Sequence, residues 1–252
     1  MSLVDFAVEQ GVAFLTLNRP DARNALNAEL RQGIRDGLRA FASDASANVL
    51  VIQAAGTAFC AGADLAEMTA LGTAMIPRDF VPAITDIADC HKPVVAAVQG
   101  AAFGGGFWLA QQCDLVIASD DARFGITEAR WGRGAPWAAS LLSLIGARAA
   151  MELLVTAEPV DAYRAHELGL VNHVVPAERL AQKCVEFAQH IASLAPLSVR
   201  AGVQMVRAQR AAAVERVAED AWTMWQPVYD SEDAQEGPRA FTEKRAPVWR
   251  GQ

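Results

Sequence analysis

The sequence has few cysteines and no long apolar run, and each shortage excludes a class of protein. Its 252 residues include four cysteines that lie far apart and form no Cys-x-x-Cys pair, so we expect reduced, mostly buried thiols. No apolar run reaches the roughly 18 residues that a membrane-spanning helix needs. The first residues also lack the basic and apolar regions of a signal peptide. These absences predict a cytoplasmic protein with no membrane contact.

Several catalytic and nucleotide-binding motifs are missing. The chain has no Gly-x-x-x-x-Gly-Lys-Ser/Thr phosphate loop and no Gly-x-Ser-x-Gly nucleophile motif. His166 and Glu167 begin a zinc-helix pattern, but Leu170 stands where the second histidine would be. The sequence therefore supports no metal site, no phosphate loop and no serine nucleophile of this type.

Positive charge is scarce as well. Lysine and arginine number 22 against 29 acidic residues, which gives a formal net charge of −7. This balance argues against a protein that binds nucleic acid through its charge. The length suits one large domain, with or without a helical appendage, and 52% hydrophobic residues are enough for a large core.

The spacing of apolar residues divides the chain into two parts. Short apolar runs alternating with helical patterns predict a parallel α/β core over residues 1–176. Apolar residues that recur every three or four positions predict a helical region over 177–252. Residues 66–91 are irregular and partly helical. We expect strands at 11–18, 49–53, 93–98, 115–118 and 122–125, and helices at 26–41, 104–112, 180–191, from 196 and at 210–225.

Two glycine-punctuated loops are the most informative features. Phe-Cys-Ala-Gly-Ala-Asp-Leu at 59–65 and Gly-Ala-Ala-Phe-Gly-Gly-Gly at 100–106 each follow a predicted strand and lead into a helical pattern. Amide groups at a helix start have no intrahelical partner. Two such loops together would offer two donors to one oxygen, which is an oxyanion hole. The alternative is that the glycines only allow close helix–strand packing; Glu128 downstream favours the functional interpretation.

These loops belong to a series of motifs that covers nearly the whole chain. It continues with Cys-Asp at 113–114, Phe-Gly-Ile-Thr-Glu at 124–128, Gly-Leu-Val-Asn-His-Val-Val at 169–175 and Ala-Phe-Thr-Glu-Lys-Arg-Ala-Pro-Val-Trp at 240–249. In order and spacing the series resembles the enoyl-CoA hydratase/isomerase (crotonase) superfamily. The resemblance implies a crotonase-like spiral of ββα units with an α-helical C-terminal region that builds homotrimers or homohexamers. It implies acyl-CoA thioester substrates and no metal or redox cofactor, because coenzyme A is carried as part of the substrate.

The resemblance also implies roles for individual residues. The amides of Ala63 and Gly105 match the oxyanion donors, and Glu128 matches a catalytic acid/base. The last motif matches a pair of residues that reach the adenine and phosphate of CoA. The expected substrate-binding positions are Arg23, Ala25, Ala61, Asp64, Leu65, Trp108, Trp137, Phe241 and Lys244. For Arg23 and Lys244 the alternative is an ordinary solvated charge.

One position departs from the hydratase pattern in a way that affects the reaction. Hydratases flank the substrate double bond with two glutamates, and this chain has Trp108 where the second would be. An indole N–H donates a hydrogen bond but accepts no proton, so we expect Trp108 to fill the space where water would be activated. Glu128 alone suits double-bond isomerisation, which is modestly favoured over hydration. Alternatively, Glu128 is an ordinary glutamate at a helix start and Trp108 packs in the core.

The remaining alternatives concern the reaction class and the acyl pocket. An acyl-CoA hydrolase or C–C lyase would use the same oxyanion hole, and a catalytically silent CoA-binding subunit would need only the binding site. Trp131 and Trp137 stand where relatives carry small residues, so they either narrow the acyl pocket or shape it for a ring.

Two arginines in the same segment are candidates for a substrate-facing charge. For Arg130 we expect a surface ion pair with Asp120 or Asp121 instead. For Arg133 both interpretations stay open.

Overall fold

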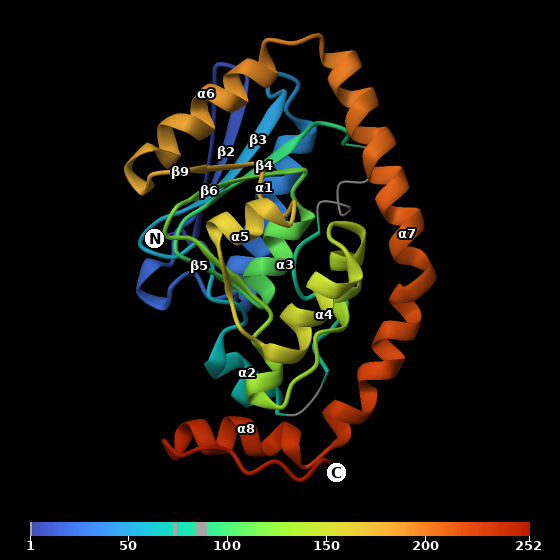
Figure 1. Cartoon of the computed structure of the whole chain (residues 1–252). Coiled ribbons are helices and arrows are strands. Elements are labelled where there is room, and N and C mark those ends of the chain that lie inside the picture. The colour runs from blue at the N-terminus through green and yellow to red at the C-terminus, as the bar shows by residue number, and fades with distance from the viewer. Residues whose placement is uncertain (1, 73–74, 84–89) are drawn as a thin grey trace.

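The computed structural model describes residues 2–72, 75–83 and 90–252, which form an α/β core with helices around it (Figure 1). The main sheet has the strand order β1-β2-β3-β4-β6-β9, in which β1 pairs antiparallel with β2 and the other pairs are parallel. Its strands are β1 (Val4–Glu9), β2 (Val12–Leu17), β3 (Val49–Ala54), β4 (Val94–Val98), β6 (Leu115–Ser119) and β9 (His173–Val175).

A smaller sheet branches off after β4. It has the order β5-β7-β8, with strands β5 (Ala101–Phe103), β7 (Arg123–Gly125) and β8 (Val160–Asp161). The chain leaves the main sheet at Gly100, whose φ of +52° and close approach to the Thr57 carbonyl leave no room for a side chain. Strand β5 then leads into helix α3 (Gly105–Gln112).

Helices cover both faces of the main sheet because its central strands are apolar on both sides. In β3, Leu50 and Ile52 face the core shared with α1 (Ala28–Ser43), whereas Val49 and Val51 face α6 (Leu180–Ala192). Successive side chains of a strand point to opposite faces, so a continuous apolar run indicates burial on both.

The other helices lie around the two sheets. Helix α7 packs against η4 and runs along one side of the molecule to α8, which contacts η3 (Figure 1). These elements are η1 (Pro20–Ala22), α2 (Leu65–Leu71), η3 (Glu128–Trp131), η4 (Pro136–Ser143), α4 (Ala147–Thr156), α5 (Ala162–Glu167), η5 (Ala177–Arg179), α7 (Pro196–Asp230) and α8 (Asp233–Thr242). No helix in the described ranges combines the length and the hydropathy needed to cross a membrane.

The predicted α/β core and the helical C-terminal part are confirmed, with two corrections. The predicted helices from 196 and at 210–225 are one continuous helix, α7, because alanine, arginine and glutamine before residue 210 favour helix and outweigh the single glycine, Gly202. Strands β1 and β5 and most elements between 128 and 175 are additional to the predicted ones. Of the irregular segment, α2 is helical, and residues 73–74 and 84–89 lie outside the described residues. The domain boundary at 176 stays a prediction, although α6 packs on the main sheet.

Candidate active site

A cavity of about 720 Å³ lies between the two glycine loops, η3 and α8. It is large enough for a small organic ligand. Seven predicted site residues line it: Ala61, Ala63, Gly105, Trp108, Glu128, Trp137 and Phe241. Its other walls include Gly62, Ala66, Met68, Gly72, Phe80, Val81, Gly104, Thr127, Trp131, Arg133, Tyr229, Gln235 and Arg239.

Two backbone amides are adjacent in the wall of this cavity. Gly105 is the first residue of α3, and Ala63 belongs to the first glycine loop. A Cβ atom on Gly105 would lie 3.9 Å from the Ala63 nitrogen, which shows how close the loops are. Within the described part of the chain, neither amide donates to a protein acceptor. The site therefore has two neighbouring free donors of the kind that an oxyanion hole requires.

Backbone hydrogen bonds hold the two loops in register. Cys60 N donates to the carbonyl of Ala101, and Phe103 N donates to the carbonyl of Cys60, both at 3.0 Å. Gly106 packs so tightly on Cys60 that a Cβ atom would overlap its carbonyl oxygen. The glycine triplet thus combines close packing at Gly106 with a cavity-facing amide at Gly105.

Glu128 is the only carboxylate among the described residues of the cavity wall. Its Oε1 accepts a hydrogen bond from Trp137 Nε1 at 3.2 Å, whereas its Oε2 is buried with no partner. Burial raises the pKa of Glu128 from about 4.5 to about 7. A carboxyl group with this pKa is present in both protonation states near neutral pH, as general acid–base catalysis requires.

Trp108 packs against Trp137, the residue that donates a hydrogen bond to Glu128. Its ring stacks on Trp137 with the centroids 5.9 Å apart and the planes at 13°, and Phe107 meets Trp137 edge-on. Trp108 and Trp137 are both buried, yet both line the cavity. Core packing and a place in the site are therefore compatible for Trp108. Glu128 begins η3, so its position at a helix start is also compatible with a place in the site.

The first glycine loop is tied to the turn before α1. Asp64 Oδ2 accepts from Arg19 Nη1 at 2.6 Å, and this hydrogen bond holds the pKa of Asp64 below its usual range. The same nitrogen donates to the carbonyl of Ala25, and the carbonyl of Arg23 accepts from Ala61 N. Asp64, Ala25 and Arg23 are not part of the cavity wall. Their expected CoA contacts stay predictions.

Of the two C-terminal residues expected to bind CoA, only Phe241 lies in the cavity wall. Phe241 lines the cavity and meets Trp131 edge-on, with the ring centroids 5.1 Å apart. Lys244 lies exposed beyond the end of α8 and is not part of the cavity wall. Leu65 begins α2, and its side chain is outside the described residues.

The two arginines after Glu128 have different surroundings. Arg130 forms a surface ion pair with Glu158 at 2.7 Å, so the expected partners Asp120 and Asp121 are wrong. Arg133 lines the cavity, and its Nη2 donates to the carbonyl of Gly72 at 2.7 Å.

Tyr229 lines the cavity and is not among the residues predicted from the motifs. Its hydroxyl donates to the carbonyl of Gly134 at 2.7 Å, and burial raises its pKa to about 12. Trp222, Trp225 and Tyr229 are spaced three and four residues apart, which places them on one face of α7. This spacing is the signal that predicts a buried aromatic face.

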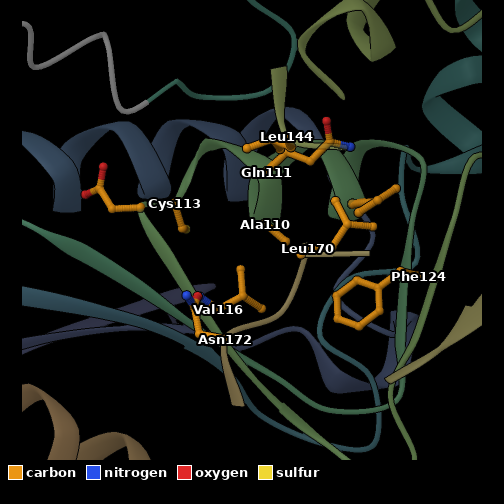
Figure 2. Close-up of a pocket in the computed structure, with 11 residues that line it drawn as sticks. Ala110, Gln111, Cys113, Val116, Phe124, Leu144, Leu170 and Asn172 are labelled. Atoms are coloured by element: carbon orange, nitrogen blue, oxygen red, sulfur yellow. The ribbon is translucent and has the colours of Figure 1, made fainter. Parts of the chain in front are cut away.

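A second, smaller cavity of about 80 Å³ lies against another face of α3 (Figure 2). Phe107 and Ala110 of α3 line it, together with Cys113 just after the helix, Val116 and Asn172. Gly105 and Trp108 are not part of its wall, so it is distinct from the cavity that holds Glu128.

The comparisons with known proteins agree with this geometry. Residues 7–252 match the model of the enoyl-CoA hydratase/isomerase family. The 2,3-dehydroadipyl-CoA hydratase of Escherichia coli strain K12 is 35% identical over 254 residues, covering 100% of both chains. The (E)-benzylidenesuccinyl-CoA hydratase of Thauera aromatica is 36% identical over 261 residues, covering 98% of this chain and 99% of that one.

The fold is similar to that of solved members. A carnitinyl-CoA hydratase from Mycobacterium avium superimposes with a TM-score of 0.86 at 33% identity, covering 100% of both chains. The match extends over the α/β core and the C-terminal helices, so the crotonase-like fold is confirmed. The chain belongs to the enoyl-CoA hydratase/isomerase family of the crotonase superfamily.

Proposed function

We propose that the cavity binds acyl-CoA thioesters, with the amides of Ala63 and Gly105 on the thioester oxygen and Glu128 as acid/base. The observation that carries this proposal is the buried, unpartnered Oε2 of Glu128 in the same cavity as two free amides. Removing a proton beside a thioester places negative charge on its carbonyl oxygen, and fixed donors stabilise that charge. This chemistry needs a proton acceptor and an oxyanion site, and calls for no metal or redox cofactor.

The leading reaction is conversion of a 3-enoyl-CoA to a 2-enoyl-CoA. Glu128 takes the proton from C2, and the electron pair of the broken C–H bond delocalises onto the thioester oxygen as a dienolate. The protonated carboxyl group then delivers the proton to C4, so the double bond moves from C3–C4 to C2–C3. A single carboxylate with a pKa of about 7 suits both steps.

Hydration of a 2-enoyl-CoA is the second candidate, and the names of the relatives favour it. The Escherichia coli and Thauera aromatica relatives are both named hydratases. Hydration adds the hydroxyl of water to C3 and a proton to C2. In this cavity Glu128 would have to deprotonate the water without a second carboxylate, since Trp108 lines the cavity where the family resemblance implies the second glutamate.

Turnover of a 3-enoyl-CoA and a 2-enoyl-CoA of equal chain length distinguishes the two reactions. Glu128→Gln keeps the size of the side chain and removes the proton acceptor, so we expect kcat to fall at least about 10²-fold. Glu158→Gln is the matched control, because Glu158 is an exposed surface carboxylate. Full activity of Glu128→Gln would contradict the assignment.

Two other outcomes would change the reaction class. Release of free CoA, followed with a thiol reagent, would indicate an acyl-CoA hydrolase, and products of a broken C–C bond would indicate a lyase. Acyl-CoA binding in a calorimeter with no turnover of any thioester would indicate a silent binding subunit.

We also propose that Arg23, Phe241 and Lys244 contact the nucleotide part of CoA, and that the protein is a cytoplasmic homotrimer or homohexamer. Exposed apolar side chains on α7, among them Leu197 and Met205, support a subunit contact there. All four cysteines are unpaired, which suits a reducing compartment. Light scattering tests the oligomer, and CoA affinity of Arg23→Gln and Lys244→Gln tests the contacts.

A further inference from the structure

Arg133 is held beside the proposed acid/base by the turn that ends η3. Its amide donates to the carbonyl of Glu128 at 3.0 Å. Within this turn Gly132 has a φ of +65° and packs on the carbonyl of Asp233, where a Cβ atom would overlap. The turn therefore fixes the backbone position of Arg133. Its side chain and that of Glu128 line the same cavity.

The guanidinium of Arg133 has no counter-ion among the described residues. One of its N–H groups donates to the carbonyl of Gly72, and most of its five donors have no partner among the residues that the structure describes. Arg239, the other arginine of the described cavity wall, forms an ion pair with Glu236. Arg133 is thus a cavity cation whose charge no described carboxylate neutralises.

The surroundings of Arg133 strengthen its attraction for an anion. The side chain is partly buried, and Trp131, Trp137 and Tyr229 line the same cavity. Desolvation lowers the pKa of the guanidinium, which reflects the unfavourable burial of its charge. A partly desolvated charge becomes more stable when it gains a partner, and a carboxylate can bind a guanidinium through two parallel hydrogen bonds.

We propose that Arg133 selects acyl-CoA substrates whose acyl group carries a second carboxylate, distant from the thioester. This inference rests on the proposed function of the cavity, in which Glu128 acts on the carbons near the thioester. The guanidinium of Arg133 reaches the carbonyl of Gly72, whereas the carboxylate of Glu128 is bound by Trp137, so the cation would meet another, more distant part of the acyl group. A phosphate of CoA offers similar oxyanion chemistry, so the experiment has to separate these two sources.

Calorimetric titration compares two saturated acyl-CoAs of equal chain length, one ending in a methyl group and the other in a carboxylate. We expect the wild type to bind the carboxylate-terminated ligand at least about tenfold more tightly. Arg133→Gln should lose most of this preference and Arg133→Lys should keep part of it. Arg130→Gln is the matched control, because it removes a surface charge three residues away and should keep the full preference.

Equal binding of the two ligands by the wild type, or a preference that survives Arg133→Gln, would overturn the inference. Weaker binding of free CoA to Arg133→Gln would assign the arginine to a phosphate and would also overturn it. Turnover of the matching enoyl-CoAs tests the proposed function separately. A carboxylate preference without turnover supports the role of Arg133 and contradicts the proposed reaction, whereas turnover without a preference contradicts only the role of Arg133.

Discussion

Trp137 donates its indole N–H to one oxygen of Glu128 at 3.2 Å, while the other oxygen is buried without a partner. One oxygen is therefore oriented by the protein, and the other is left to exchange a proton. Burial is the main cause of the raised pKa of Glu128, and the bond from Trp137 opposes it because this bond stabilises the ionised form. The orientation and the proton affinity of Glu128 thus both depend on its surroundings.

Trp137→Phe should move the acidic limb of the pH–activity profile to higher pH. The substitution removes the donor to the ionised carboxylate, so the pKa of Glu128 rises and less of the base is ionised at neutral pH. We expect activity at pH 7 to fall several-fold, with partial recovery at higher pH, measured as kcat/KM against pH. Trp249→Phe, at a half-exposed tryptophan near the C-terminus, is the control and should leave the profile unchanged.

Glu128 should make the folded protein less stable as the pH rises. Its folded pKa of about 7 exceeds the ordinary value of 4.5, so between these values the unfolded chain releases the proton more readily. The free energy of unfolding therefore decreases as the pH rises from about 4.5 to about 7, and it stays lower above pH 7. The total loss is about 3 kcal/mol. Glu128→Gln should not show this loss, because glutamine does not titrate.

Urea unfolding at about pH 4 and pH 8 measures the effect. Relative to the wild type, Glu128→Gln should gain stability at the higher pH. The same pH dependence in wild type and variant would show that Glu128 does not titrate with a raised pKa.

Gly106→Ala should destabilise the protein by about 1–3 kcal/mol and reduce activity. The new Cβ atom would overlap the carbonyl of Cys60, so the two glycine loops would have to separate. Gly202→Ala is the control, since Gly202 lies within α7 with no atom within 4 Å of the new Cβ. That variant should be as stable as the wild type or up to about 1 kcal/mol more stable. Denaturant midpoints and kcat/KM test both variants, and equal stability of the two would contradict the packing argument.

Asp64→Asn should destabilise the protein by about 1–3 kcal/mol at neutral pH, because it removes a partly buried partner of Arg19. The pKa of Asp64 is lowered by Arg19, so its contribution to stability is present above the ordinary pKa and is lost as the pH falls. The difference between wild type and variant should therefore shrink in acid. Asp36→Asn, in an exposed pair with Arg39, should change stability by less than about 1 kcal/mol. Equal effects of the two substitutions would contradict a structural role for Asp64.

Much of the core follows from local patterns. The apolar run at 49–53 predicts a buried strand, and in the structure β3 packs on α1 with one face and on α6 with the other. The break predicted before residue 210 is wrong, because the residues around it favour helix and α7 continues from Pro196 to Asp230. Among the site residues, Glu128 and the glycine loops are recognisable from motif position, whereas Tyr229 enters the cavity from α7, about a hundred residues further along the chain.

The sequence by itself determined the family, the α/β core and the two glycine loops, because periodicity, glycine placement and motif order are local properties of the chain. Only the tertiary structure decided which groups meet. In the folded chain Trp137 donates a hydrogen bond to Glu128, Arg130 forms an ion pair with Glu158, and Arg133 lines the cavity without a carboxylate partner among the described residues. These contacts depend on how separate loops and helices pack against one another, and that packing is the sum of many weak interactions between distant residues.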